Sequence, residues 1–135
     1  MRIMIDTNVL FSALLFPSQK MDSIFDEIAN NHTLIICSYV INELHDVTKR
    51  KFPTKLAVVA KLLSKMSYEL VYTPQIIEEK LFEIRDINDY PILHTAIVED
   101  VDVFITGDND FSVVDIEKPL ILTPKQFRDM FLLDK

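Results

Sequence analysis

Apolar positions along the chain fall into short β-like runs separated by longer stretches with helical spacing. The short runs predict five strands, at residues 2–5, 33–37, 68–72, 102–106 and 119–122. The stretches between them predict helices over residues 8–15, 20–30, 39–50, 54–66, 75–83 and 89–99, with a last helix starting at Pro124. Strands that alternate with helices are typical of parallel β-α-β units, so we expect one α/β domain over residues 1–135.

Composition narrows the classes of site that the chain can build. Gly107 is its one glycine, which excludes a glycine-rich Rossmann turn and a Walker P-loop. Cys37 is its one cysteine, which excludes disulfides within the chain and cysteine-built zinc or iron–sulfur sites, and favours a reducing cytoplasm. Residues 9–16, the longest nearly apolar stretch, are too few to span a membrane, which takes about 20. Asp6 interrupts any signal-peptide core, so no targeting segment is expected.

Acidic residues follow two of the predicted strands at the points where those strands end. Asp6 comes directly after strand 2–5, and Asp108 and Asp110 come shortly after strand 102–106. In a parallel sheet the carboxyl ends of the strands meet at one rim, where ligands bind. We therefore expect these acids to share that rim.

Two predicted helices bring further acids toward the same rim. Ser38 is expected to cap helix 39–50, and Glu43 lies about one turn into that helix, beside its buried face. Asp89 stands at the start of the apolar stripe of helix 89–99, and Asp86 lies one turn earlier.

Carboxylates that converge in this way would repel one another, and a hard divalent cation would relieve the repulsion. Carboxylate oxygens suit Mg²⁺ or Mn²⁺, which commonly support phosphodiester hydrolysis. Each acid also has an ordinary structural interpretation, which the sequence leaves open. Asp6 and Asp89 are able to cap helices, Asp108 and Asp110 are typical turn residues, and Glu43 is compatible with an exposed helix face.

The ordered set of these motifs carries a family resemblance that covers essentially the whole chain. The set runs through Met4-Ile5-Asp6-Thr7-Asn8-Val9-Leu10, Ser38, Glu43-Leu44, Arg85-Asp86-Ile87-Asn88-Asp89, Phe104-Ile105-Thr106-Gly107-Asp108-Asn109-Asp110-Phe111 and Thr123-Pro124. The chain resembles the PIN-domain family of metal-dependent ribonucleases and, more narrowly, the VapC-like toxins of bacterial and archaeal toxin–antitoxin pairs.

This resemblance implies a three-layer α/β/α sandwich with a mainly parallel sheet of about five strands. It implies that the catalytic, metal-binding carboxylates are Asp6, Glu43, Asp89 and Asp108. It implies supporting roles for the secondary acids Asp86 and Asp110, for Thr7 and Asn8 as braces of the site, and for Thr106 as a hydroxyl that faces the metal. The implied cofactor is one or two Mg²⁺ or Mn²⁺ ions.

The implied reaction is endonucleolytic cleavage of single-stranded or loop RNA. An activated water attacks the phosphorus in line and leaves a 3′-hydroxyl and a 5′-phosphate. Histidine chemistry is not needed, because His32, His45 and His94 show no ligand spacing.

Charge is segregated along a chain whose formal net charge is −7. Residues 47–68 carry six cations and no acid, whereas residues 73–117 have a net charge of −10. Within the basic segment we expect RNA contacts from Lys49, Arg50, Lys51 and Lys55. A solvated helical face and a surface for an acidic partner segment are the alternatives.

The expected partners are RNA, an antitoxin protein and further copies of the chain in a homodimer or higher oligomer, with no membrane. Helix 54–66 is apolar around more than half its circumference, which fits either core packing or docking of such a partner. A haloacid-dehalogenase-type site is excluded because Asn8 stands where its second aspartate is needed. A catalytically silent PIN-like module that binds RNA or protein remains the alternative function.

Overall fold

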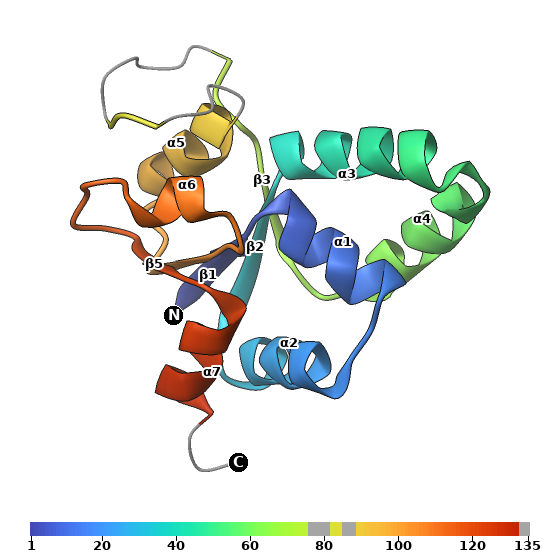
Figure 1. Cartoon of the computed structure of the whole chain (residues 1–135), viewed down its shortest axis with the longest axis horizontal. Helices are drawn as coiled ribbons and strands as arrows, with labels where there is room; N and C mark the ends of the chain where they lie inside the picture. The colour runs from blue at the N-terminus through green and yellow to red at the C-terminus, as the bar shows by residue number, and fades with distance from the viewer. Residues whose placement is uncertain (76–81, 85–88, 133–135) are drawn as a thin grey trace.

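A five-stranded parallel sheet lies at the centre of the computed structural model, which describes residues 1–75, 82–84 and 89–132 (Figure 1). The strands are β1 (Arg2–Ile5), β2 (Thr33–Cys37), β3 (Glu69–Val71), β4 (Val103–Ile105) and β5 (Leu120–Leu122). They are ordered β3-β2-β1-β4-β5, and every neighbouring pair is parallel. The first and fourth strands, whose ends carry acids, are therefore direct neighbours.

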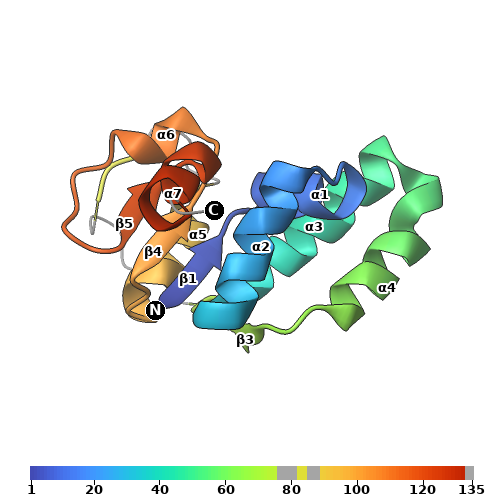
Figure 2. The same ribbon diagram turned by 90° about the horizontal axis from the view of Figure 1, so that it is seen from below.

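Helices cover the sheet on both sides. They are α1 (Thr7–Leu15), α2 (Gln19–Asn31), α3 (Ser38–Lys51), the short 3₁₀ helix η1 (Pro53–Lys55), α4 (Leu56–Lys65), α5 (Tyr90–Val98), α6 (Asn109–Ser112) and α7 (Pro124–Phe131). Figures 1 and 2 show α1, α3 and α4 on one side of the strands and α5 and α6 on the other. None of these described helices is both long and apolar enough to cross a membrane.

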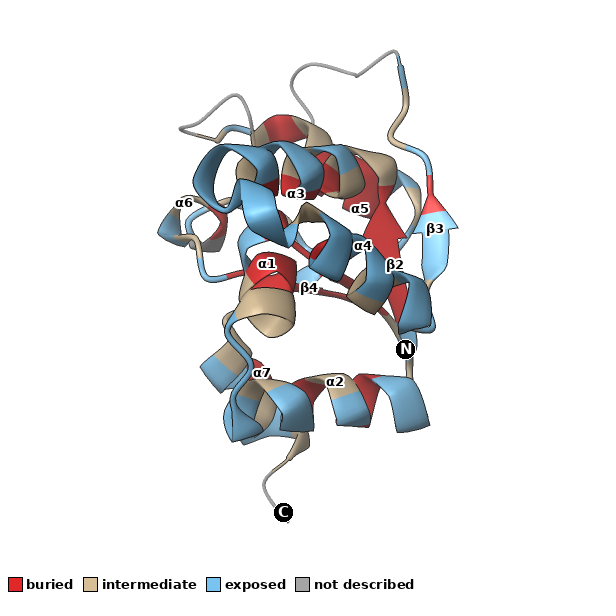
Figure 3. Ribbon diagram, turned by 90° about the vertical axis from the view of Figure 1, so that its right-hand side faces the viewer, coloured by how far each residue is buried: buried red, intermediate tan, exposed pale blue. Residues whose placement is uncertain are grey.

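The core forms between these layers because the central strands are apolar on both faces. Ile3, Met4 and Ile5 are fully buried, as are Phe104 and Ile105 on the neighbouring strand. Buried positions in Figure 3 follow the strands and the sides of the helices that face them. Continuous apolar runs of this kind are expected for parallel strands that helices cover on both sides. The predicted α/β architecture with a five-stranded parallel sheet is confirmed.

The expected cap at Ser38 differs from the structure, and two other local interpretations need comment. Ser38 does not cap the helix after β2; the helix begins at Ser38 itself, and its hydroxyl accepts the N–H of Thr73 at 2.9 Å. Residues 109–112 form the short helix α6, in place of the turn that was one of the interpretations left open for Asp108 and Asp110. Most of the predicted helix 75–83 lies outside the described residues, and its described ends, Gln75 and residues 82–83, are not helical.

Helix α4 packs against other helices. Only Val59 of this helix is buried, and Val58 is 43% exposed. The helix contacts α1, α3 and η1. It follows that the apolar residues of the predicted helix 54–66 serve mainly a helix–helix contact, with part of the apolar surface left in solvent.

Candidate active site

The carboxyl ends of β1 and β4 bring the first site residues side by side. Ile5 and Ile105 are paired in the sheet, so Asp6 and Thr106 are the next residues on adjacent strands. The N–H of Asp6 continues the ladder by donating to the carbonyl of Ile105 at 3.2 Å. Two residues beyond Thr106, Asp108 caps helix α6 by accepting the N–H of Asp110 at 2.9 Å. The rim expected from the sequence is therefore present.

Three half-buried carboxylates form a tight group at this rim. One oxygen each from Asp89, Asp108 and Asp110 lies within 4.8 Å of the other two. Asp89 sits at the N-cap position of α5, but its side chain makes no capping hydrogen bond with the helix. Asp89 thus joins acids that are about 20 residues further along the chain.

Asp6 lies next to this group and is 4% exposed. One of its carboxylate oxygens accepts the N–H of Val9 at 2.9 Å, so Asp6 does cap α1. The other oxygen accepts the hydroxyl of Thr106, and the Thr106 oxygen accepts the N–H of Asp108 at 3.0 Å. Thr106 therefore links Asp6 to the turn that carries Asp108, and the capping and site roles of Asp6 coexist.

Glu43 reaches the rim from α3. The buried face of this helix carries Val40 and Leu44, and Glu43 is half-buried beside them. Its carboxylate accepts a hydrogen bond from the hydroxyl of Thr7, the first residue of α1. This bond ties the start of α1 to α3, and it brings Glu43 close enough to Asp6 for their charges to interact.

Burial, together with the neighbouring charges, raises the cost of ionising Asp6. The pKa of Asp6 is raised from 3.8 to about 6, chiefly by burial and to a smaller extent by repulsion from Asp108 and Glu43. Hydrogen bonds from Thr106 and from the N–H of Val9 act in the opposite direction. Arg2 does not relieve the repulsion, because its guanidinium pairs with Glu69 at 2.9 Å and Glu99 at 3.7 Å.

The structure groups the predicted acids somewhat differently from the sequence. Among the described residues, the group within 4.8 Å contains Asp110, which the sequence ranked as secondary, while Asp6 and Glu43 lie beside it. The spacing of Asp108 and Asp110 could have indicated this grouping, because the cap of α6 brings both acids to one side. Asn8 is exposed on α1, and Asp86 lies outside the described residues.

The predicted RNA-contact residues lie further along α3 and in η1. Lys49, Arg50 and Lys51 form the last turn of α3, and Lys55 ends η1; all four are exposed. They begin six residues beyond Glu43, which at 1.5 Å per residue is about 9 Å along the helix. The structure thus places them near the site without making them part of it.

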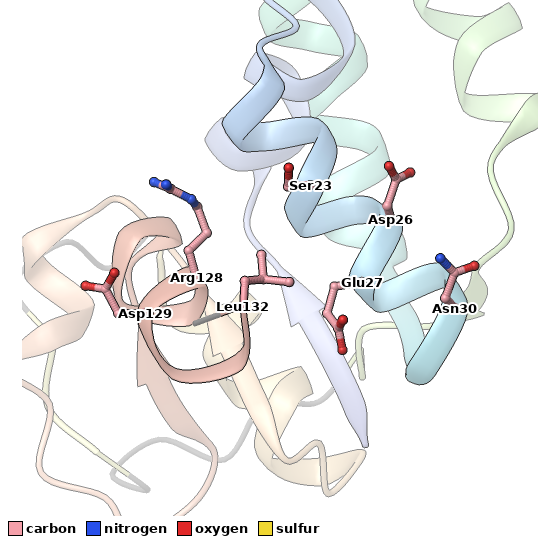
Figure 4. Close-up of a pocket in the computed structure, with 7 residues that line it drawn as sticks. All are labelled: Ser23, Asp26, Glu27, Asn30, Arg128, Asp129 and Leu132. Carbon is pink, nitrogen blue, oxygen red and sulfur yellow. The ribbon is translucent and has the colours of Figure 1, made fainter. Parts of the chain in front are cut away.

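A pocket of about 450 Å³ opens between α2 and α7 (Figure 4). Its lining is Ser23, Asp26, Glu27, Asn30, Arg128, Asp129 and Leu132. None of these is a predicted site residue, and Glu27 is engaged with the ring of His32 at 3.2 Å. The pocket is therefore separate from the acidic rim.

The donor set of the rim fits a hard divalent cation. Asp89, Asp108 and Asp110 offer carboxylate oxygens, the ligand type that Mg²⁺ and Mn²⁺ prefer. Each oxygen lies within 4.8 Å of the others, close enough for all three to contact one ion. Asp6 lies beside this group, where the hydroxyl of Thr106 holds one of its carboxylate oxygens.

The solved structures that share this fold include two toxin–antitoxin proteins. One is VapBC2 from Rickettsia felis, whose crystal structure is described as bound to a DNA fragment from the VapBC2 promoter. It matches with a TM-score of 0.67 and 19% sequence identity, and the match covers 90% of this chain and 97% of that chain. VapC20 from Mycobacterium tuberculosis, described as a sarcin–ricin loop cleaving toxin, matches with a TM-score of 0.60 and 10% identity, over 82% and 92% of the two chains. No curated protein matches the sequence. Residues 2–110 match the family described as PIN domain, and the chain therefore belongs to the PIN domain family.

Proposed function

We propose that this chain is a metal-dependent endoribonuclease that serves as the toxin of a type II toxin–antitoxin pair. The observation that carries the proposal is the group of carboxylates from Asp89, Asp108 and Asp110 at the rim of a PIN-domain sheet. Clustered carboxylates without metal would only destabilise the fold, whereas with a divalent cation they form a hydrolytic site.

The proposed ligands of one or two Mg²⁺ or Mn²⁺ ions are Asp6, Glu43, Asp89 and Asp108, with Asp110 and Asp86 as supporting acids. An ion held there would activate a water for attack on a phosphodiester and would stabilise the charge that develops on the leaving oxygen.

The hydroxyls of the site act by holding carboxylates. Thr106 donates to Asp6 and accepts from the N–H of Asp108, which fixes the two acids relative to each other. Thr7 donates to Glu43, which fixes the position of Glu43 on α3 relative to the start of α1. Asn8 is exposed on the first turn of α1, and its proposed role is to brace the site.

RNA is the proposed substrate, although the protein carries a net charge of −7. The exposed cations Lys49, Arg50, Lys51 and Lys55 offer phosphate contacts beyond the rim. The likeness to VapC20, named for cleaving the sarcin–ricin loop, supports RNA over other phosphodiesters. The likeness to VapBC2 supports an antitoxin partner, and we expect a homodimer or higher oligomer.

Cleavage of a mixed single-stranded RNA with Mn²⁺, with Mg²⁺ and with EDTA tests this function. Wild type should cleave with metal and not with EDTA, and Asp108→Asn should abolish cleavage while the protein stays folded. The variant also excludes a contaminating nuclease. If neither metal supports cleavage and neither raises the melting temperature, the chain is a catalytically silent PIN-like binding module.

A further inference from the structure

Helices α1 and α3 start together at the acidic rim and meet again at their far ends. At the rim the hydroxyl of Thr7 donates to Glu43. At the other end the rings of Phe16 and Phe52, each just after the last residue of its helix, lie with centroids 5.8 Å apart. Nine residues separate the two contacts on each helix, which at 1.5 Å per residue is about 14 Å. The helices therefore hold the rings of Phe16 and Phe52 at a fixed distance from the rim.

These two rings are exposed and rest on a buried third ring. Phe16 is 56% exposed and Phe52 is 38% exposed, while Phe11 below them is 9% exposed. The centroid of Phe11 lies 6.0 Å from that of each of the other two. Packing on Phe11 holds the two outer rings, whose planes lie at 68° to each other, so each ring offers its own surface to a planar ligand.

Cations flank Phe52 along the chain. Lys49, Arg50 and Lys51 immediately precede Phe52, and Lys55 follows in η1, where its N–H donates to the carbonyl of Phe52 at 2.9 Å. No acid occurs from residue 47 to residue 68. A second copy of the chain would bring the same positive charge to this face and be repelled in a self-complementary contact. A negatively charged ligand with flat apolar faces fits better, and single-stranded nucleic acid has both properties.

We propose that Phe16 and Phe52 form a platform on which bases of single-stranded RNA stack, while the neighbouring cations bind its phosphates. The inference rests on the proposed function, because it takes RNA as the substrate. At about 3.4 Å per stacked nucleotide, the distance of about 14 Å places the platform roughly four nucleotides from the scissile phosphate.

Binding measured in EDTA tests the platform without any cleavage. The probe is a fluorescein-labelled oligouridylate of about 12 nucleotides, followed by anisotropy. The double variant Phe16→Leu/Phe52→Leu keeps apolar side chains against Phe11 but removes the flat rings, and its affinity should fall by about tenfold. The matched control is Phe131→Leu, which removes a ring from α7 and should leave the affinity unchanged.

A second variant reports stacking directly. The chain contains no tryptophan, so Phe16→Trp introduces a single indole. Its ring retains the stacking surface, so RNA affinity should stay within about twofold of wild type and indole fluorescence should be quenched on titration with the same RNA.

Unchanged affinity in the double leucine variant, or unquenched fluorescence in Phe16→Trp, overturns the platform. Failure of wild type to bind the oligouridylate in EDTA overturns it as well. If the double variant instead turns a wild-type dimer into a monomer in sedimentation, with RNA affinity retained, the face is an interface between copies. The proposed function fails on a different result, namely no metal-dependent cleavage by wild type.

Discussion

The two ends of α1 and α3 present opposite chemistry. At the rim the helices hold half-buried or buried acids, and the pKa of Asp6 is raised to about 6 by burial and like charge. At the far end they present Phe16, Phe52 and the exposed cations that precede Phe52. This difference would allow a chain with a net charge of −7 to act on RNA, as we propose. The acids are concentrated where metal would neutralise them, and the cations lie about 9–14 Å away, where phosphates would be held.

The largest effect is expected from removing an acid of the rim. Asp108→Asn should lower metal-dependent cleavage by about 1,000-fold, equivalent to about 4 kcal/mol, because it removes a carboxylate from the group proposed to bind metal. Single-turnover cleavage of labelled RNA measures the rate. Asp115→Asn, which changes an exposed acid outside the group, is the matched control and should cleave like wild type.

The second effect concerns the stability of the metal-free protein. The folded-state pKa of Asp6, about 6, lies above its ordinary value of 3.8, so the folded state binds a proton more readily than the unfolded state. Stability in EDTA should therefore increase as pH falls from 7 toward 4. Asp6→Asn should be more stable than wild type at pH 7, by up to about 3 kcal/mol, with a flatter pH profile. Urea unfolding at several pH values measures both, and a wild type that loses stability between pH 7 and pH 5 would contradict this interpretation.

Metal binding should reverse this destabilisation. At a Mn²⁺ concentration about 100 times its Kd, wild type should gain about 2.7 kcal/mol of stability, a rise of about 10 °C in Tm. EDTA should remove the gain, and Asp108→Asn should show little of it. If wild type and Asp108→Asn gain the same stability from Mn²⁺, the ion binds at a site that does not include Asp108.

The smallest effect is expected at the far end of α3. Lys51→Ala should weaken RNA binding by about threefold and lower the slope of log K against log salt by about 0.7, because one phosphate contact with a single strand is lost. Lys125→Ala, an exposed cation at the start of α7, is the control. An unchanged salt slope in Lys51→Ala would remove this lysine from the RNA surface.

The position of the rim could be predicted from the sequence because it depends on local patterns. Apolar runs ending in Asp6 and Asp108 mark strand ends, and parallel strands bring such ends together. What could not be predicted depends on contacts between distant segments. Ser38 was expected to cap a helix, but its hydroxyl binds the N–H of Thr73, 35 residues away. The approach of Phe16 to Phe52 likewise follows from the packing of α1 on α3, which no local pattern encodes.

The central claim is that the rim performs the chemistry and the far ends of α1 and α3 bind the RNA. Single-turnover cleavage measured across enzyme concentration tests it most directly, because it separates the maximal rate from the half-saturating concentration. Asp108→Asn should lower the maximal rate and leave half-saturation near that of wild type. Phe16→Leu/Phe52→Leu should raise half-saturation about tenfold at an unchanged maximal rate. If the aromatic variant loses maximal rate with unchanged half-saturation, or if Asp108→Asn retains the wild-type rate, the division of roles between the two ends is wrong.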